Sequence, residues 1–296
     1  MIRTPAVLPA AVLGLVLVLS GCAQRSDAGG APPPASPGLD LPDDGDALVL
    51  QVAYTGGFLT PEMLAGRLPV LSVYADGRVL SEGPVIAIYP GPAWPNVQVQ
   101  QADRATVQRL VQHALTAGVA DTTDLGTPAI ADAPSTRFTV TTAAGTTVRE
   151  VYALSEGAGT SSGLTDEQQA ARAELADLLT ELTDLPQELG PAEQAPAAYE
   201  PTAVAALARP WSAPADDLSL GTRPDLPWPG PALPGETVGP ELGCTVATGD
   251  QATAVVAAAR GADQLTPWTT GDGARWSISF RPLLPHESGC GDLAGT

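Results

Sequence analysis

A Gly-x-Ser-x-Gly pattern at residues 159–163 is the most specific catalytic motif in this 296-residue chain. A serine in such a pattern acts as a nucleophile when it lies on a sharp turn between a strand and a helix. Ser161 would then be the nucleophile, and His286, which follows intervening acidic residues, would be its general base. The preceding apolar run ends near Leu154, so a loop lies where the turn has to be tight. A serine hydrolase that uses Ser161 and His286 is therefore our alternative hypothesis.

The first 22 residues combine charge and hydrophobicity in the order of an export signal. Arg3 and the free amine supply a positive end, and an uncharged apolar stretch follows from Ala6 to Leu19. This stretch is shorter than the roughly 20 residues of a membrane span, which favours a signal-peptide core. The segment ends in Leu19-Ser20-Gly21-Cys22, which resembles the lipobox of bacterial lipoproteins. The resemblance implies cleavage between Gly21 and Cys22 and a diacylglycerol on the thiol of Cys22.

This signal predicts where the mature protein lies. Two acyl chains give stable anchoring where one chain is marginal. We therefore expect an extracytoplasmic protein that is anchored through the Cys22 lipid to the outer face of the cell membrane. An ordinary secretory signal and an uncleaved anchor are the alternatives. Residues 22–46 are rich in proline and aspartate and lack apolar periodicity, which predicts a disordered tether.

Cys244 and Cys290 are the two cysteines that the lipid does not use. An even pair in an exported chain predicts a disulfide. It would close a loop of about 47 residues, which corresponds to roughly 4 kcal/mol of stabilisation. The alternatives are a nucleophilic cysteine or a mixed metal site with His286 and Asp250, but neither cysteine has a C-x-x-C partner. We expect neither a metal nor a cofactor.

Charge excludes several classes of function. All 14 basic residues are arginine, which removes the Schiff-base and P-loop chemistries that need a lysine. The mature chain from Cys22 has 13 arginines and 33 acidic residues, and 13 − 33 gives a net charge of −20. Such a balance argues against binding to nucleic acid through a basic face and against charge-driven adhesion to anionic lipid.

The apolar pattern between residues 47 and 209 predicts an α+β domain. Asp76-Gly77 predicts a type I′ turn between two of its strands. Helices are expected over 102–119 and from Thr165, where Gln168 completes a capping box, to a stop at Pro186. Strands are expected at 47–54, 70–75, 78–81, 84–89, 97–100, 137–142 and 146–154. This order predicts an antiparallel sheet with two amphipathic helices on one face.

The C-terminal third divides into two parts. Residues 210–240 are dense in proline and predict an extended segment, which we expect to lie against the body through Trp211 and Trp228. Residues 241–296 predict a small disulfide-closed α/β unit, with strands at 244–247 and 275–281 and a helix at 251–260. The predicted divisions of the chain are therefore 1–21, 22–46, 47–209, 210–240 and 241–296.

Three groups of short motifs lie in the second half of the chain: Arg281-Pro282-Leu283-Leu284-Pro285 with the Trp276 strand and Cys290, Tyr199-Glu200-Pro201 with Ala203 to Arg209, and Thr266-Pro267-Trp268. Together they resemble motifs of secreted actinobacterial lipoproteins. The resemblance implies a similar architecture and location but no activity.

Our first hypothesis is a lipid-anchored, non-enzymatic protein that binds an envelope protein or a small ligand. Trp94, in a loop between Pro92 and Pro95, is the residue that we expect to contact this partner. A passive structural or chaperone role is a third hypothesis.

Overall fold

The computed structural model describes residues 39–157, 163–189, 195–213 and 223–293. These residues form a mixed α+β structure with two sheets. The helices are α1 (Pro61–Gly66), α2 (Arg104–Thr116), α3 (Asp166–Glu188) and α4 (Gly249–Arg260), with a 3-10 turn at Cys290–Leu293. The strands are β1 (Leu48–Gly56), β2 (Leu71–Tyr74), β3 (Arg78–Glu82), β4 (Val97–Gln101), β5 (Pro134–Thr142), β6 (Gly145–Tyr152), β7 (Ala197–Ala198), β8 (Ala203–Pro210), β9 (Leu226–Pro227), β10 (Glu236–Gly239), β11 (Leu242–Thr248), β12 (Trp268–Thr269) and β13 (Arg275–Pro282).

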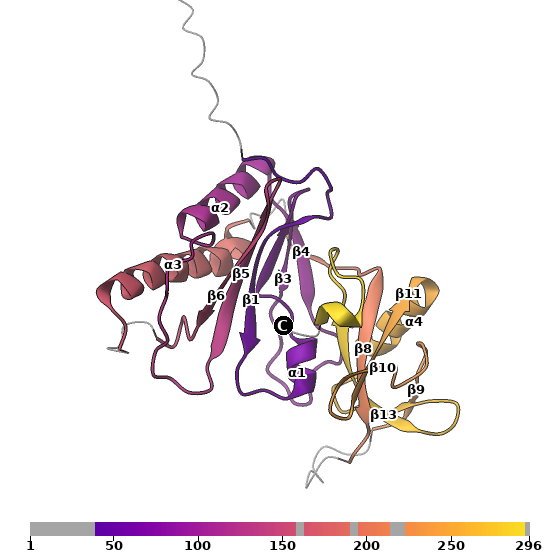
Figure 1. Cartoon of the computed structure of the whole chain (residues 1–296). Coiled ribbons are helices and arrows are strands. Elements are labelled where there is room, and N and C mark those ends of the chain that lie inside the picture. The colour runs from indigo at the N-terminus through magenta and orange to yellow at the C-terminus, as the bar shows by residue number, and fades with distance from the viewer. Residues whose placement is uncertain (1–38, 158–162, 190–194, 214–222, 294–296) are drawn as a thin grey trace, which may run out of the picture. The chain divides into compact units, whose positions relative to one another are not determined.

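The first sheet has the strand order β6-β5-β1-β2-β3-β4-β7, with antiparallel pairing throughout. Helices α2 and α3 cover one of its faces (Figure 1). The Asp103 side chain caps α2 by accepting a hydrogen bond from the amide of Thr106 at 2.7 Å. Thr165 and Gln168 form the predicted capping box of α3. The predicted α+β fold, with two helices on one face of an antiparallel sheet, is confirmed.

Two local predictions are wrong. The turn after β2 has a positive φ only at Gly77, so it is a three-residue connection and not a type I′ turn. Pro186 does not stop α3, which continues to Glu188. Pro186 lies in the last turn of the helix, where little helix follows it.

The predicted tether also ends earlier than expected. Leu41 is buried in the core under α2 and α3, and the carbonyl of Asp40 accepts a hydrogen bond from Ala143 at 2.8 Å. The segment from residue 39 is therefore part of the folded body. Cys22 and the rest of the predicted tether lie outside the described residues.

The second sheet has the strand order β10-β11-β8-β13-β12-β9. Its central strand, β8, comes from residues that we assigned to the first domain. Alternate residues of β8 face opposite cores, with Ala206 packed near α4 and Leu207 packed near α1. Both faces are buried, so its sequence is a continuous apolar run without the alternation that predicts a strand.

The proline-dense segment lies against this sheet, as expected, at Trp228. Its ring packs edge-on to Trp268, with ring centroids 6.0 Å apart. Trp211 instead receives the guanidinium of Arg275, 3.7 Å from its ring centroid. Residues 214–222 lie outside the described residues.

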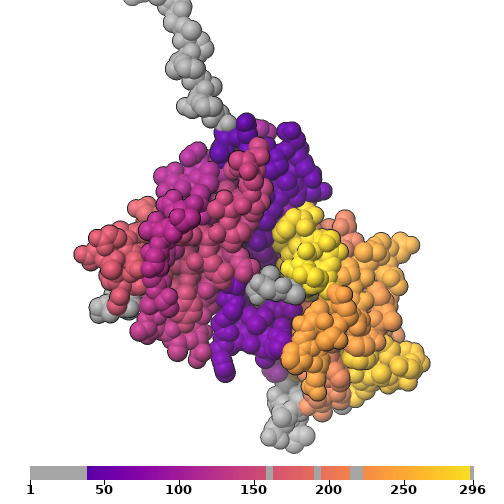
Figure 2. Space-filling model, viewed as in Figure 1, coloured from indigo at the N-terminus to yellow at the C-terminus, as the bar shows by residue number. Residues whose placement is uncertain are grey.

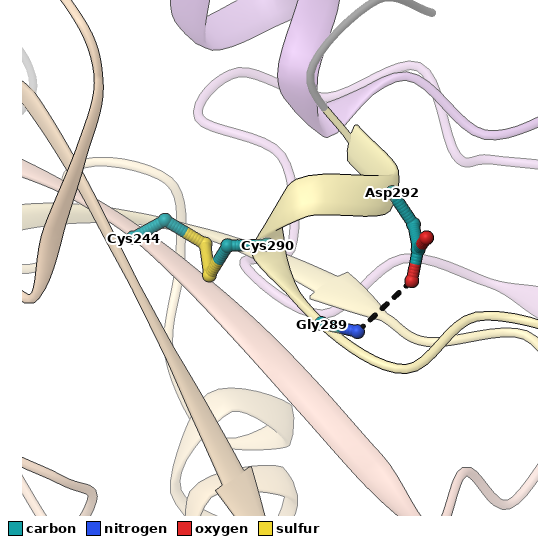
Figure 3. The surroundings of a disulfide bond; sticks show 4 residues. All are labelled: Cys244, Gly289, Cys290 and Asp292. Atoms are coloured by element: carbon teal, nitrogen blue, oxygen red, sulfur yellow. Dashed lines mark hydrogen bonds between the residues drawn. A yellow bond between two sulfur atoms is a disulfide. The ribbon is translucent and has the colours of Figure 1, made fainter.

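The predicted disulfide is present between Cys244 in β11 and Cys290 (Figure 3). The Asp292 carboxylate accepts a hydrogen bond from the amide of Gly289 at 3.1 Å and so supports the turn that carries Cys290. The disulfide therefore ties the C-terminal end to the second sheet.

The residues after β13 connect the two sheets. Arg281 is fully buried, and its guanidinium binds the carboxylate of Glu287 through two hydrogen bonds of 2.7 and 3.1 Å. The same carboxylate accepts a hydrogen bond from the amide of Leu284 at 2.7 Å. This hydrogen-bonded turn places Leu284 in a buried cluster with Tyr74 and Leu80 of the first sheet. Figure 2 shows these C-terminal residues (yellow) against the first strands (indigo).

Two tyrosines complete this junction. The hydroxyl of Tyr199 donates to the carbonyl of Leu283 at 2.9 Å, and that of Tyr74 is 2.9 Å from the Nδ1 of His286. Burial raises the pKa of Tyr74, and the Glu287 charge adds to this effect. Burial also raises the pKa of Tyr199, to about 12. Both groups are therefore held in the neutral form in the folded protein.

We predict that stability falls as the pH rises above 10.0, the ordinary pKa of tyrosine, toward about 12. In this range the unfolded chain loses protons that the folded protein retains, so ionisation favours unfolding. Urea unfolding across the alkaline range measures this loss. The pH dependence should weaken in a Tyr74→Phe, Tyr199→Phe double variant and stay as in the wild type for Tyr89→Phe, which changes an exposed tyrosine. An unaltered dependence in the double variant would contradict the assignment.

Candidate functional site

A wide groove runs between the two sheets. Its wider part, of about 1160 Å³, is lined by α1, by Glu82 at the end of β3, and by Arg209 and Ser279 of the second sheet. Its narrower part, of about 570 Å³, extends to Trp94 and Ile278. The parts share six residues, so we treat them as one groove. The shared residues are Glu62, Glu82, Arg209, Gln264, Ser279 and Phe280.

Glu62 links the two sides of the groove. The side chain of Thr60 caps α1 by accepting a hydrogen bond from the amide of Met63, which places Glu62 in the first turn. The Glu62 carboxylate accepts a hydrogen bond from the Nε of Arg209 at 2.7 Å and another from the hydroxyl of Ser279. Both donors stand on neighbouring strands of the second sheet. The charge of Glu62 is therefore compensated within the protein.

Glu82 has a different environment. Its side chain is exposed to the groove, and its carboxylate accepts no hydrogen bond from any described residue. Desolvation raises the pKa of its carboxyl group, while the charge of Arg281 opposes this effect. The guanidinium of Arg281 itself donates two hydrogen bonds to the carboxylate of Glu287. Glu82 therefore offers a carboxylate that no described hydrogen-bond donor occupies.

The strand predicted at residues 84–89 is absent, and this segment forms one wall of the groove instead. Pro84 and Pro90 have no N–H group, and no described strand pairs with the segment. Its large apolar side chains point to solvent, with exposed fractions of 67% for Val85, 62% for Ile86 and 58% for Ile88. Exposed apolar side chains that gather beside a concave surface mark interaction sites.

Both ends of this segment are fixed. The amide of Gly83 donates to the carbonyl of Asn96 at 2.7 Å, which holds the first end at the first sheet. The carbonyl of Gly91 accepts from Gln264 at 3.0 Å, and the amide of Ala93 donates to Ala262 at 3.1 Å. The second end is therefore held beside α4, and the segment bridges the two sheets along the groove.

Trp94 lies in this groove, half-buried, with its ring centroid 6.3 Å from that of Phe280. The loop position that we predicted is correct, and the neighbouring groove was not foreseen. Whether Trp94 contacts a partner stays a prediction.

Of the two residues in the hydrolase hypothesis, His286 lies in the described part of the chain and Ser161 does not. His286 packs against Tyr74 at the junction of the sheets, and the resulting desolvation lowers its pKa. The neighbouring Glu287 binds Arg281. Ser161 lies outside the described residues, as do Gly21 and Cys22.

Metal and membrane elements are not found in the described part of the chain. Cys244 and Cys290 are oxidised to a disulfide, so the mixed metal site that we weighed as an alternative lacks its thiolates. Among the described residues, no three His, Cys, Asp or Glu side chains lie close enough to hold a metal ion. Among the same residues, no helix is both long and apolar enough to cross a membrane.

Sequence reasoning missed the acidic and basic residues of the groove. A signal for Glu62 was available, because Thr60 followed by Pro61 is typical of a helix start. No signal linked it to Arg209 or Ser279, which are more than a hundred residues away in the sequence. Only the pairing of β8 with β13 brings these two together.

No protein-family model matches this chain, and comparisons with curated proteins and with solved structures found no similar protein.

Proposed function

We propose that this protein is a lipid-anchored, extracytoplasmic binding protein that holds a ligand or another envelope protein in the groove between its sheets. The observation that carries the proposal is the wall of exposed apolar side chains at Val85, Ile86 and Ile88. Solvent exposure of three such neighbours is unfavourable in a free protein, and a bound partner would remove it from water.

The groove is built for binding rather than for bond cleavage. Arg209 compensates the charge of the Glu62 carboxylate and Ser279 donates a second hydrogen bond to it, so this carboxylate acts as a structural link between the two sides of the groove. Apolar walls with a few polar groups are the usual composition of a binding site. A serine hydrolase that uses Ser161 and His286 stays the alternative hypothesis.

The anchor is supported by the signal sequence that ends at Cys22. A tether from Cys22 to the folded body at residue 39 would keep the groove clear of the membrane headgroups while holding it near the surface. Binding near a membrane needs only modest affinity, because the anchor confines the protein to the same layer as its partners.

We predict that the mature wild-type protein begins at Cys22 and carries the added mass of a diacylglycerol. Intact-mass spectrometry of protein from the membrane fraction measures both properties. Cys22→Ser should abolish the lipid mass and the cleavage, since no other thiol is available at this position, whereas Ser26→Ala should leave both unchanged. A wild-type protein that keeps Met1 or lacks acyl chains would contradict the proposed location.

We also predict that a photo-crosslinking amino acid in place of Trp94 captures a discrete partner in intact cells. The same amino acid in place of Gln112, which is exposed on α2 away from the groove, should capture none. Adding Ile86→Asp should abolish the adduct at position 94, because it places a charge on the apolar wall. Equal labelling from both positions, or a diffuse smear from position 94, would favour a passive structural role.

A further inference from the structure

The narrower part of the groove has an uncompensated negative charge. Among the described residues, three charged side chains line it: Glu62, Glu82 and Arg209. Glu62 and Arg209 form an ion pair at 2.7 Å and cancel each other. Glu82 therefore remains the one charge that a ligand would meet. The chemistry that completes it is a cationic group on the ligand.

The surroundings of Glu82 restrict the kind of cation. On one side lie Val85 and Ile86, and Phe280 of the second sheet lines the same part of the groove. A compact hydrated ion would gain nothing from these apolar walls. A lysine or arginine side chain would gain from both features, because its aliphatic stem packs on apolar surface while its charged end reaches the carboxylate of Glu82.

The backbone of the wall adds a second, independent requirement. The amides of Val85, Ile86, Ala87 and Tyr89 donate no hydrogen bond to any described residue. The sequence between Pro84 and Pro90 is rich in β-branched residues, which suit a strand, yet no described strand pairs with it. In β-augmentation an extended peptide supplies carbonyls to free backbone amides at a sheet edge, and the unpaired amides of this wall offer the same donors beside an open groove.

A lipid surface fits these observations less well. Apolar side chains at residues 85–88 could enter a bilayer, but the free amides beside them would then lack partners in hydrocarbon. The unpaired carboxylate of Glu82 and the net charge of −20 would also oppose approach to an anionic membrane. The same negative charge favours encounter with a basic segment.

We propose that the groove binds an extended peptide segment of a partner protein, with a lysine or arginine of that segment paired with Glu82, flanking apolar side chains on Val85 and Ile86, and peptide carbonyls on the free amides of the wall. This inference rests on the proposed function of the groove as a binding site, and it names the chemistry of the partner.

The test is a selection from a displayed library of random ten-residue peptides against the mature lipidated protein in detergent. Wild-type protein should enrich peptides that carry one basic residue flanked by apolar ones. Glu82→Arg should instead enrich peptides with an acidic residue at that position. Glu174→Arg, a matched change on the exposed face of α3, should select the same peptides as the wild type.

A synthetic peptide from the wild-type selection then gives a magnitude. Its Kd should rise about tenfold or more in Glu82→Gln, as expected for loss of a charge-assisted hydrogen bond. Its binding should be lost in Ile86→Asp and unchanged in Glu174→Gln. The pKa of Glu82, followed by NMR, should fall when the peptide binds, because a cation then stabilises the carboxylate.

The other outcomes separate this inference from the proposed function. Peptides that bind in an Ile86-dependent manner without charge bias, or with no change in Glu82→Arg, would overturn the role of Glu82 but leave the groove as a binding site. Binding to phosphatidylcholine vesicles that Ile86→Asp abolishes would assign the wall to a membrane and overturn the inference. Dimerisation that Ile86→Asp abolishes would assign it to a second copy, with the same consequence. No Ile86-dependent binding of any kind would overturn both proposals.

Discussion

The ion pair between Arg281 and Glu287 is the interaction on which the joining of the two sheets depends. Both side chains are almost completely removed from solvent, with exposed fractions of 0% and 6%. Removing two charges from water costs free energy that their mutual attraction has to offset, so a buried pair by itself contributes little net stability. The pair acts on the geometry of the chain. The carboxylate of Glu287 also accepts a hydrogen bond from the amide of Leu284, which fixes the turn after β13. That turn carries Leu284 onto the first sheet.

Each sheet contributes a segment to the core of the other. The C-terminal turn of the second sheet packs on Tyr74 and Leu80, while α1, which lies between β1 and β2 in the sequence, packs Ala65 against Leu207 of the second sheet. This exchange holds both walls of the groove in place. Glu62 and the segment at residues 84–89 both line the groove, and each is tied by hydrogen bonds to the second half of the chain, Glu62 to Arg209 and Ser279 and the segment's end at Gly91 to Gln264. A rigid groove loses little entropy on binding, which favours recognition of an extended ligand.

Sequence reasoning succeeded where a feature is local. The capping box at Thr165 and the disulfide between Cys244 and Cys290 follow from neighbouring residues or from simple counting. Sequence reasoning failed where contacts between distant segments determine the structure. β8 is buried on both faces and shows no alternation, and residues 84–89 have the composition of a strand without a strand to pair with. The groove was not predictable, because its residues come from segments that only the packing of the two sheets brings together.

The most direct measurement is the distance between spin labels on the two halves of the body, one replacing Glu174 on α3 and the other replacing Ala254 on α4, by double electron–electron resonance. Wild-type protein should give one narrow distance distribution. Glu287→Gln leaves Arg281 buried without its counter-charge, at a cost of about 3–5 kcal/mol, and should broaden the distribution as the junction opens. Glu236→Gln, on the exposed strand β10, should keep it narrow. A distribution that is already broad in the wild type, or that stays narrow in Glu287→Gln, would contradict the role of this ion pair.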